Sequence, residues 1–67
     1  SMNIQLNGET REVADHISVA DLLESLELYG KRIAVEINEE LITRSHFASY
    51  QLQPDDRIEI VQAIGGG

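Results

Sequence analysis

Apolar and polar residues alternate along four stretches of the chain, the pattern of strands that bury one face. In the first strand Ile4 and Leu6 are expected to face inward, and in the second Val13. In the last strand Ile58 and Ile60 share the buried face. The pattern therefore predicts strands over residues 3–7, 10–14, 33–38 and 57–63.

Turn signals connect these strands. Asn7-Gly8 lies between the first two, and it accepts the positive backbone angles of a tight hairpin, so these strands should run antiparallel. Asn38-Glu39 is a second candidate turn, after which Leu41 and Ile42 would form a short edge strand. Pro54-Asp55-Asp56 predicts a turn before the last strand.

Between the second and third strands the apolar period lengthens, which predicts an amphipathic helix. Its buried face would carry Val19, Leu22, Leu23 and Leu26. Ser18 is expected to be the N-cap, and Ile17 with Leu22 has the spacing of a hydrophobic staple. Gly30 is predicted to cap the helix C-terminus, with Lys31 and Arg32 beside the negative end of its dipole.

The stretch from residue 44 to 50 has too few periodic apolar residues for more than one helical turn. Phe47 and Tyr50 within it are expected to close one end of the core. The element order thus predicts an α+β fold, in which a mixed β-sheet is covered on one face by a single α-helix. A right-handed crossover would place the last strand centrally beside the first, an arrangement that resembles the ubiquitin-like β-grasp fold.

Composition excludes several functions. The chain has 67 residues and no cysteine, so one small domain without disulfides or thiolate metal sites is expected, in the cytoplasm. Twelve acidic and five basic residues give a net charge of -7, which disfavours nucleic acid and anionic membranes as partners. A core of this size rarely supplies more than about 3–5 kcal/mol of stability, so we expect no enzyme active site.

The domain is predicted to span residues 1–64, with Ser1 as the remnant of a cleaved tag, and residues 65–67 to form a flexible glycine tail. Glycine has no side chain to bury, so Gly65, Gly66 and Gly67 add nothing to the core. They do allow a bare backbone to enter a narrow space. A short disordered end is the alternative explanation of the same residues.

The sequence resembles the ThiS family, the sulfur carriers of bacterial thiamine biosynthesis, along essentially the whole chain after Ser1. The segments that carry the resemblance are residues 3–9, 18–23, 33–38 and 61–67. The family's usual ending is a glycine pair, whereas this chain ends in three glycines, which leaves the roles of Gly65 and Gly66 less defined than that of Gly67. A glycine ending alone is shared with ubiquitin and with the small subunit of molybdopterin synthase.

The resemblance implies a chemistry for Gly67. A ThiF-like adenylating enzyme would join its carboxylate to AMP from ATP, and a sulfur donor would displace AMP to leave a thiocarboxylate. A ThiG-like thiazole synthase would then accept the sulfur. ATP is used by the partner enzyme, so the resemblance implies no cofactor in this chain. A carrier for another pathway, a ubiquitin-like modifier and a non-carrier β-grasp interaction module are the alternatives.

Val61 lies on the strand face opposite Ile58 and Ile60, which one helix leaves uncovered. We therefore predict that Val61, Ala63 and Ile64 form an apolar patch that binds the partner and aims Gly65 and Gly66. An isolated exposed valine is the competing interpretation.

The other polar residues favour ordinary roles. His16 and His46 lack ligand partners at metal-site spacing, so no metal site is expected. The acid pairs Glu39-Glu40 and Asp55-Asp56 fall at turns, where solvation is expected to account for them.

Overall fold

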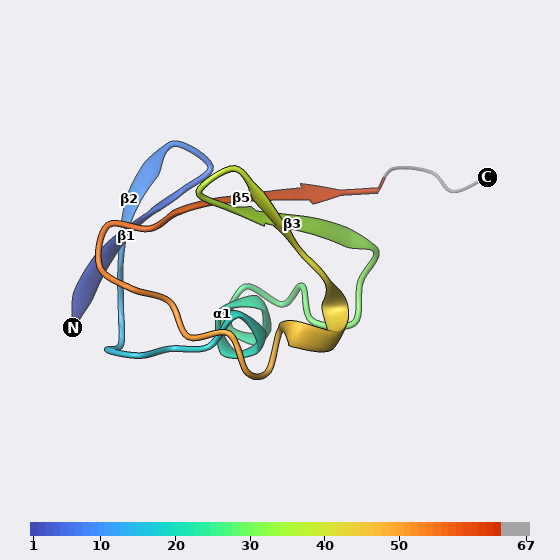
Figure 1. Ribbon diagram of the computed structural model, residues 1–67, viewed down its shortest axis with the longest axis horizontal. Helices are drawn as coiled ribbons and strands as arrows, with labels where there is room; N and C mark the ends of the chain where they lie inside the picture. Colours follow the sequence, from blue (N-terminus) through green and yellow to red (C-terminus); the bar gives the residue numbers. More distant parts are fainter. Residues whose placement is uncertain (64–67) are drawn as a thin grey trace.

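The computed structural model describes residues 1–63, which form a five-stranded mixed sheet with one α-helix packed on one of its faces (Figure 1). The elements are β1 (Met2–Leu6), β2 (Glu9–Val13), α1 (Val19–Ser25), β3 (Ile33–Ile37), β4 (Glu40–Ile42), the 3-10 helix η1 (Arg44–His46) and β5 (Arg57–Gln62). The predicted fold class and the order of the elements are confirmed. The predicted division between residues 64 and 65 lies outside the described residues.

Two tight hairpins form the outer pairs of strands. The β1–β2 turn is Asn7-Gly8, with φ of 49° and 84°, and the β3–β4 turn is Asn38-Glu39, with φ of 52° and 70°. Positive φ at both central residues gives the turn the twist of the flanking strands. Both predicted turns are therefore confirmed, although β1 and β2 each begin and end one residue earlier than predicted.

The last strand lies at the centre of the sheet, whose order is β2-β1-β5-β3-β4. It pairs in parallel with β1, where Leu6 is opposite Ile58, and antiparallel with β3, where Ala34 is opposite Val61. This confirms the predicted central position. Because β5 is hydrogen-bonded along both edges, its direction is fixed by two neighbours.

The core lies between the sheet and α1. Ser18 caps the helix as predicted, since its Oγ accepts a hydrogen bond of 3.1 Å from the Asp21 backbone N–H. The residues of the predicted helix face are buried, except that Leu26 is only partly so. Fully buried side chains on both layers include Ile4, Val19, Leu22, Leu23, Val35, Ile37, Leu52 and Ile58.

The loop after η1 supports the start of the helix. The backbone N–H of Val19 donates to the Tyr50 carbonyl at 2.9 Å, and that of Ala20 donates to the Phe47 carbonyl at 2.9 Å. These two donors have no partner within the helix itself, so the loop satisfies them. The single helical turn at η1 and the core positions of Phe47 and Tyr50 are as predicted.

The helix ends earlier than predicted, and Gly30 does not cap it. Leu28 N–H donates to the Leu23 carbonyl at 2.8 Å, and Glu27 N–H donates to the Glu24 carbonyl at 3.0 Å. This is a Schellman motif. Glu27, with φ of 61°, takes the left-handed position that glycine usually occupies.

Gly30 instead belongs to a following turn, in which Lys31 N–H donates to the Leu28 carbonyl at 3.0 Å and Gly30 has φ of 84°. The last turn of α1 contains no basic residue. The predicted interaction of Lys31 and Arg32 with the helix dipole is therefore wrong, and both cations are available for other roles.

Candidate functional site

The described chain leaves the body of the protein from β5, which presents different side chains on its two faces. Ile58 points into the core and is 1% exposed, whereas Val61 is 64% exposed on the opposite face. This is the face that α1 does not cover. The predicted placement of Val61 opposite Ile58 and Ile60 is confirmed, although Ile60 is only partly buried.

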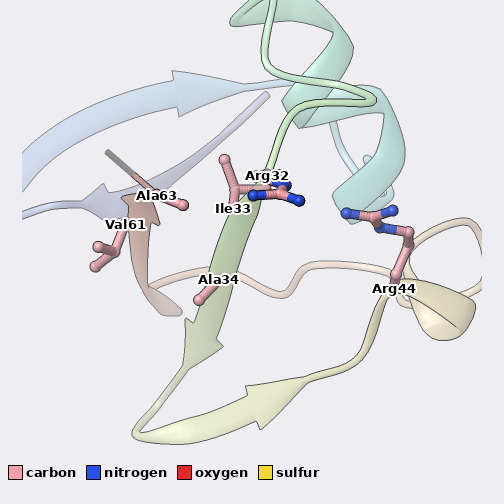
Figure 2. Close-up of a pocket in the computed structure, with 6 residues that line it drawn as sticks. All are labelled: Arg32, Ile33, Ala34, Arg44, Val61 and Ala63. Atoms are coloured by element: carbon pink, nitrogen blue, oxygen red, sulfur yellow. The ribbon is translucent and has the colours of Figure 1, made fainter. Parts of the chain in front are cut away.

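Val61 and Ala63 border a hollow of about 340 Å³, which we call the exit hollow (Figure 2). Its lining consists of Arg32, Ile33, Ala34, Arg44, Val61 and Ala63. Ala63 lies just beyond β5 but remains tied to the body, because its backbone N–H donates to the Arg32 carbonyl at 2.8 Å. The chain is therefore held in place up to the last described residue.

The structure thus brings together the two predicted patch residues that it describes, Val61 and Ala63. The remaining predicted site residues, Ile64, Gly65, Gly66 and Gly67, lie outside the described residues. Whether the patch binds a partner stays a prediction.

Four residues of the exit hollow were not predicted to be there. Ala34 lies opposite Val61 in the register of β3 and β5, so its position follows once these two strands are known to pair. Arg32 was predicted to lie at the helix end. Arg44 arrives from η1, after the edge strand, and no periodicity in the sequence indicates its position.

Two asparagine side chains clamp β5 on opposite edges. On the β1 side, Asn7 accepts a hydrogen bond from Ile60 N–H at 2.8 Å and donates to the Ile60 carbonyl at 3.3 Å. On the β3 side, Asn38 Oδ1 accepts from Arg57 N–H at 3.0 Å. Each asparagine is also a turn residue with positive φ, so the same residue reverses one hairpin and holds the central strand.

Asp56 is buried, contrary to the prediction that both residues of its acid pair are solvated. It is 9% exposed, its Oδ1 accepts from Asn38 Nδ2 at 3.0 Å, and its Oδ2 accepts from Gln53 N–H at 2.9 Å. A buried carboxylate needs such donors. Asp56 therefore closes the turn before β5, while Asp55, Glu39 and Glu40 are exposed.

Tyr50 lies near this carboxylate. Partial burial raises the pKa of the Tyr50 hydroxyl above its ordinary value, and the negative charges of Asp56 and Glu40 raise it further. The shift follows from the position of Tyr50 at the edge of the core.

The histidines do not meet metal-binding partners in the part of the chain that the structure describes. His46 Nδ1 lies 3.1 Å from Thr43 Oγ1, and no three histidine, cysteine, aspartate or glutamate residues within 1–63 are grouped as metal ligands would be. Within the same range, no helix has the length and apolar character needed to cross a membrane.

The central parallel pair β1–β5, the two hairpins and the single covering helix define a β-grasp protein. The crystal structure of the thiamine biosynthesis protein ThiS from Geobacter metallireducens has this fold, with a TM-score of 0.84 and 30% sequence identity over 98% of this chain and 100% of that chain. The ThiS family matches residues 4–67, and the chain belongs to that family.

Two relatives illustrate the range of the match. The sulfur carrier protein ThiS of Bacillus subtilis is 38% identical over 65 residues, which cover 96% of this chain and 98% of that protein. A thiazole synthase of Magnetococcus marinus is 38% identical over 66 residues, which cover 98% of this chain but only 20% of that protein. The resemblance deduced from the sequence is confirmed: the chain is a sulfur carrier of the ThiS family, whose carrier proteins are not enzymes.

Proposed function

We propose that this chain carries the sulfur for thiazole formation in thiamine biosynthesis, in the cytoplasm. The observation that carries the proposal is the full-length match to a ThiS sulfur carrier. A thiazole synthase that contains a segment of the same kind supports the choice of pathway, because fusion keeps a carrier beside its acceptor.

The reaction takes place at the carboxylate of Gly67. A carboxylate is ionised at neutral pH and is a poor acyl electrophile. A ThiF-like adenylating enzyme converts it with ATP into an acyl adenylate and pyrophosphate. A sulfur donor then attacks the acyl carbon and AMP leaves, so that Gly67 ends in a thiocarboxylate, which the ThiG-like thiazole synthase accepts.

The body of the protein contributes position rather than chemistry. The clamp by Asn7 and Asn38 and the Ala63–Arg32 hydrogen bond hold the chain firmly up to Ala63. Four residues beyond Ala63 extend at most about 13–14 Å. We propose that Val61, Ala63 and Ile64 bind the partner, and that Gly65 and Gly66 pass through a channel too narrow for side chains.

Intact mass spectrometry tests this function. The chain ending at Gly67 is incubated with ATP, a sulfur donor and a ThiF-type adenylating enzyme, and we expect a mass increase of one oxygen-to-sulfur replacement, localised to Gly67. Removal of Gly66-Gly67 should abolish the product without changing the melting temperature. Loading only by an enzyme of molybdopterin synthesis, or transfer to protein lysines, would refute the thiamine assignment.

A further inference from the structure

Most of the positive charge of this acidic chain lies around the exit hollow and a smaller hollow beside it. The second hollow, of about 110 Å³, shares Ile33 and Arg44 with the first and is also bordered by Lys31. Three of the chain's five lysine and arginine residues line these two hollows, and none of its twelve aspartates and glutamates does.

Arg32 and Arg44 reach the rim of the exit hollow from different elements. Arg32 immediately precedes β3 and Arg44 begins η1, and Figure 2 shows their guanidinium groups turned toward each other. Among residues 1–63, the one ion pair joins the N-terminal amine to Asp15 at 3.4 Å. No carboxylate of the described chain therefore neutralises either arginine, and two neighbouring cations favour an anion between them.

We propose that Arg32 and Arg44 form a carboxylate-binding site for the adenylating enzyme, which inserts an aspartate or glutamate between them and an aliphatic side chain against Val61 and Ala34. The proposal rests on the carrier function above. It adds a specific recognition element, a basic rim, to the apolar patch.

The chemistry of the hollow favours a protein carboxylate over a nucleotide phosphate. Guanidinium groups bind carboxylates and phosphates alike through paired hydrogen bonds, but arginine is enriched at protein interfaces. The exit hollow has an aliphatic floor, and the two aromatic residues nearby, Tyr29 and Phe47, line only the second hollow, so no ring lies beside Val61 and Ala34 for a base to stack on. The one backbone N–H that Ala63 offers is already bonded to Arg32.

The surrounding charge gives this site a directional effect. A net charge of -7 repels an acidic partner from most of the surface, so an acidic partner approaches most readily through the basic rim. The rim lies beside Ala63, where the described chain ends. Electrostatic attraction would therefore present the chain end to the enzyme first.

Charge reversal with a matched control tests the proposal. The variant Arg32→Glu/Arg44→Glu is compared with Arg11→Glu/Arg57→Glu, which makes the same change in net charge at exposed residues of β2 and β5 that line neither hollow. Pyrophosphate release by the adenylating enzyme is measured against carrier concentration, and melting temperatures verify that both variants are folded.

We expect kcat/KM to fall roughly tenfold or more in the Arg32/Arg44 variant at about 50 mM salt, mainly through KM, and less than about threefold in the control. The difference should shrink at about 1 M salt, where charges are screened within about 3 Å. Equal losses in the two variants, or no loss in either, would overturn the proposal while leaving the carrier function intact.

A second measurement does not depend on the carrier function. The Nε–H signals of the arginines are followed by NMR while the wild-type protein is titrated with N-acetyl-Leu-Glu-amide, and with N-acetyl-Leu-Gln-amide as control. We expect shifts at Arg32 and Arg44 with the glutamate peptide alone, and smaller ones at Arg11 and Arg57. Equal shifts at all four arginines, or a response to AMP but not to the peptide, would refute the site even if the carrier proved inactive.

Discussion

Replacing Asn38 by glycine tests how strongly the clamp stabilises the fold. Glycine retains the backbone conformation, since Asn38 has φ of 52°, but removes the hydrogen bonds to Arg57 N–H and Asp56 Oδ1, each 3.0 Å long. An ordinary hydrogen bond contributes about 1 kcal/mol net, and one to a charged group about 1.5–3 kcal/mol. The removal of both therefore costs about 2.5–4 kcal/mol.

Glycine offsets part of this cost, because it adopts positive φ more easily than asparagine does. We expect a net loss of about 2–3 kcal/mol in the free energy of unfolding. For a domain of this size that corresponds to a fall in melting temperature of about 10–20 °C. Thermal and urea unfolding followed by circular dichroism measure it, and the urea m-value should not change.

The neighbouring residue provides the control. Glu39 has φ of 70° in the same turn, is exposed, and makes none of the side-chain hydrogen bonds found within residues 1–63. Glu39→Gly should therefore leave the melting temperature unchanged or raise it. A drop of less than about 3 °C for Asn38→Gly, or an equal drop for both variants, would show that the side-chain bonds do not stabilise β5.

Two further predictions concern Tyr50 and Val61. Folding raises the pKa of the Tyr50 hydroxyl, so the unfolded chain ionises first and the free energy of unfolding falls as the pH rises above about 10. Tyr50→Phe should make this fall shallower, as measured by urea unfolding from about pH 9 to 11. An unchanged fall would contradict the assignment. Val61→Asp should change the unfolding free energy by no more than about 0.5 kcal/mol, because Val61 is 64% exposed. It should nevertheless raise the KM for adenylation. The control is Leu41→Asp, which should not raise the KM, because Leu41 is 62% exposed on β4 but lies outside the exit hollow. Equal effects of the two variants on the KM would argue against the patch.

Local signals in the sequence were sufficient for the hairpins, the helix start and the central strand. Asn7-Gly8 fits a two-residue turn, Ser18 fits a cap, and alternation places Val61 opposite Ile58. Each of these depends on residues close together in the chain, or on a period that a strand must keep. They therefore follow from the sequence without knowledge of the tertiary contacts.

Features that depend on distant partners were not predictable in this way. Glu27 rather than Gly30 ends the helix, because Leu28 returns to Leu23 by a hydrogen bond that the glycine rule does not anticipate. Asp56, in the turn before β5, is buried because Asn38 from the β3–β4 hairpin and Gln53 N–H satisfy its carboxylate. The positions of Arg32 and Arg44 at the exit hollow depend in the same way on the tertiary arrangement of β3 and η1.

The central position of β5 also has a consequence for synthesis. As the last strand within residues 1–63, β5 fills the gap between β1 and β3, so a nascent chain has two separate halves of a sheet until residues 57–62 have been translated. Pairing of strands so distant in sequence is slow, because the loop between them must be closed first. A truncated product that lacks β5 lacks the centre of its sheet and should be removed by proteases, so the folded pool would consist of chains that have been translated through β5.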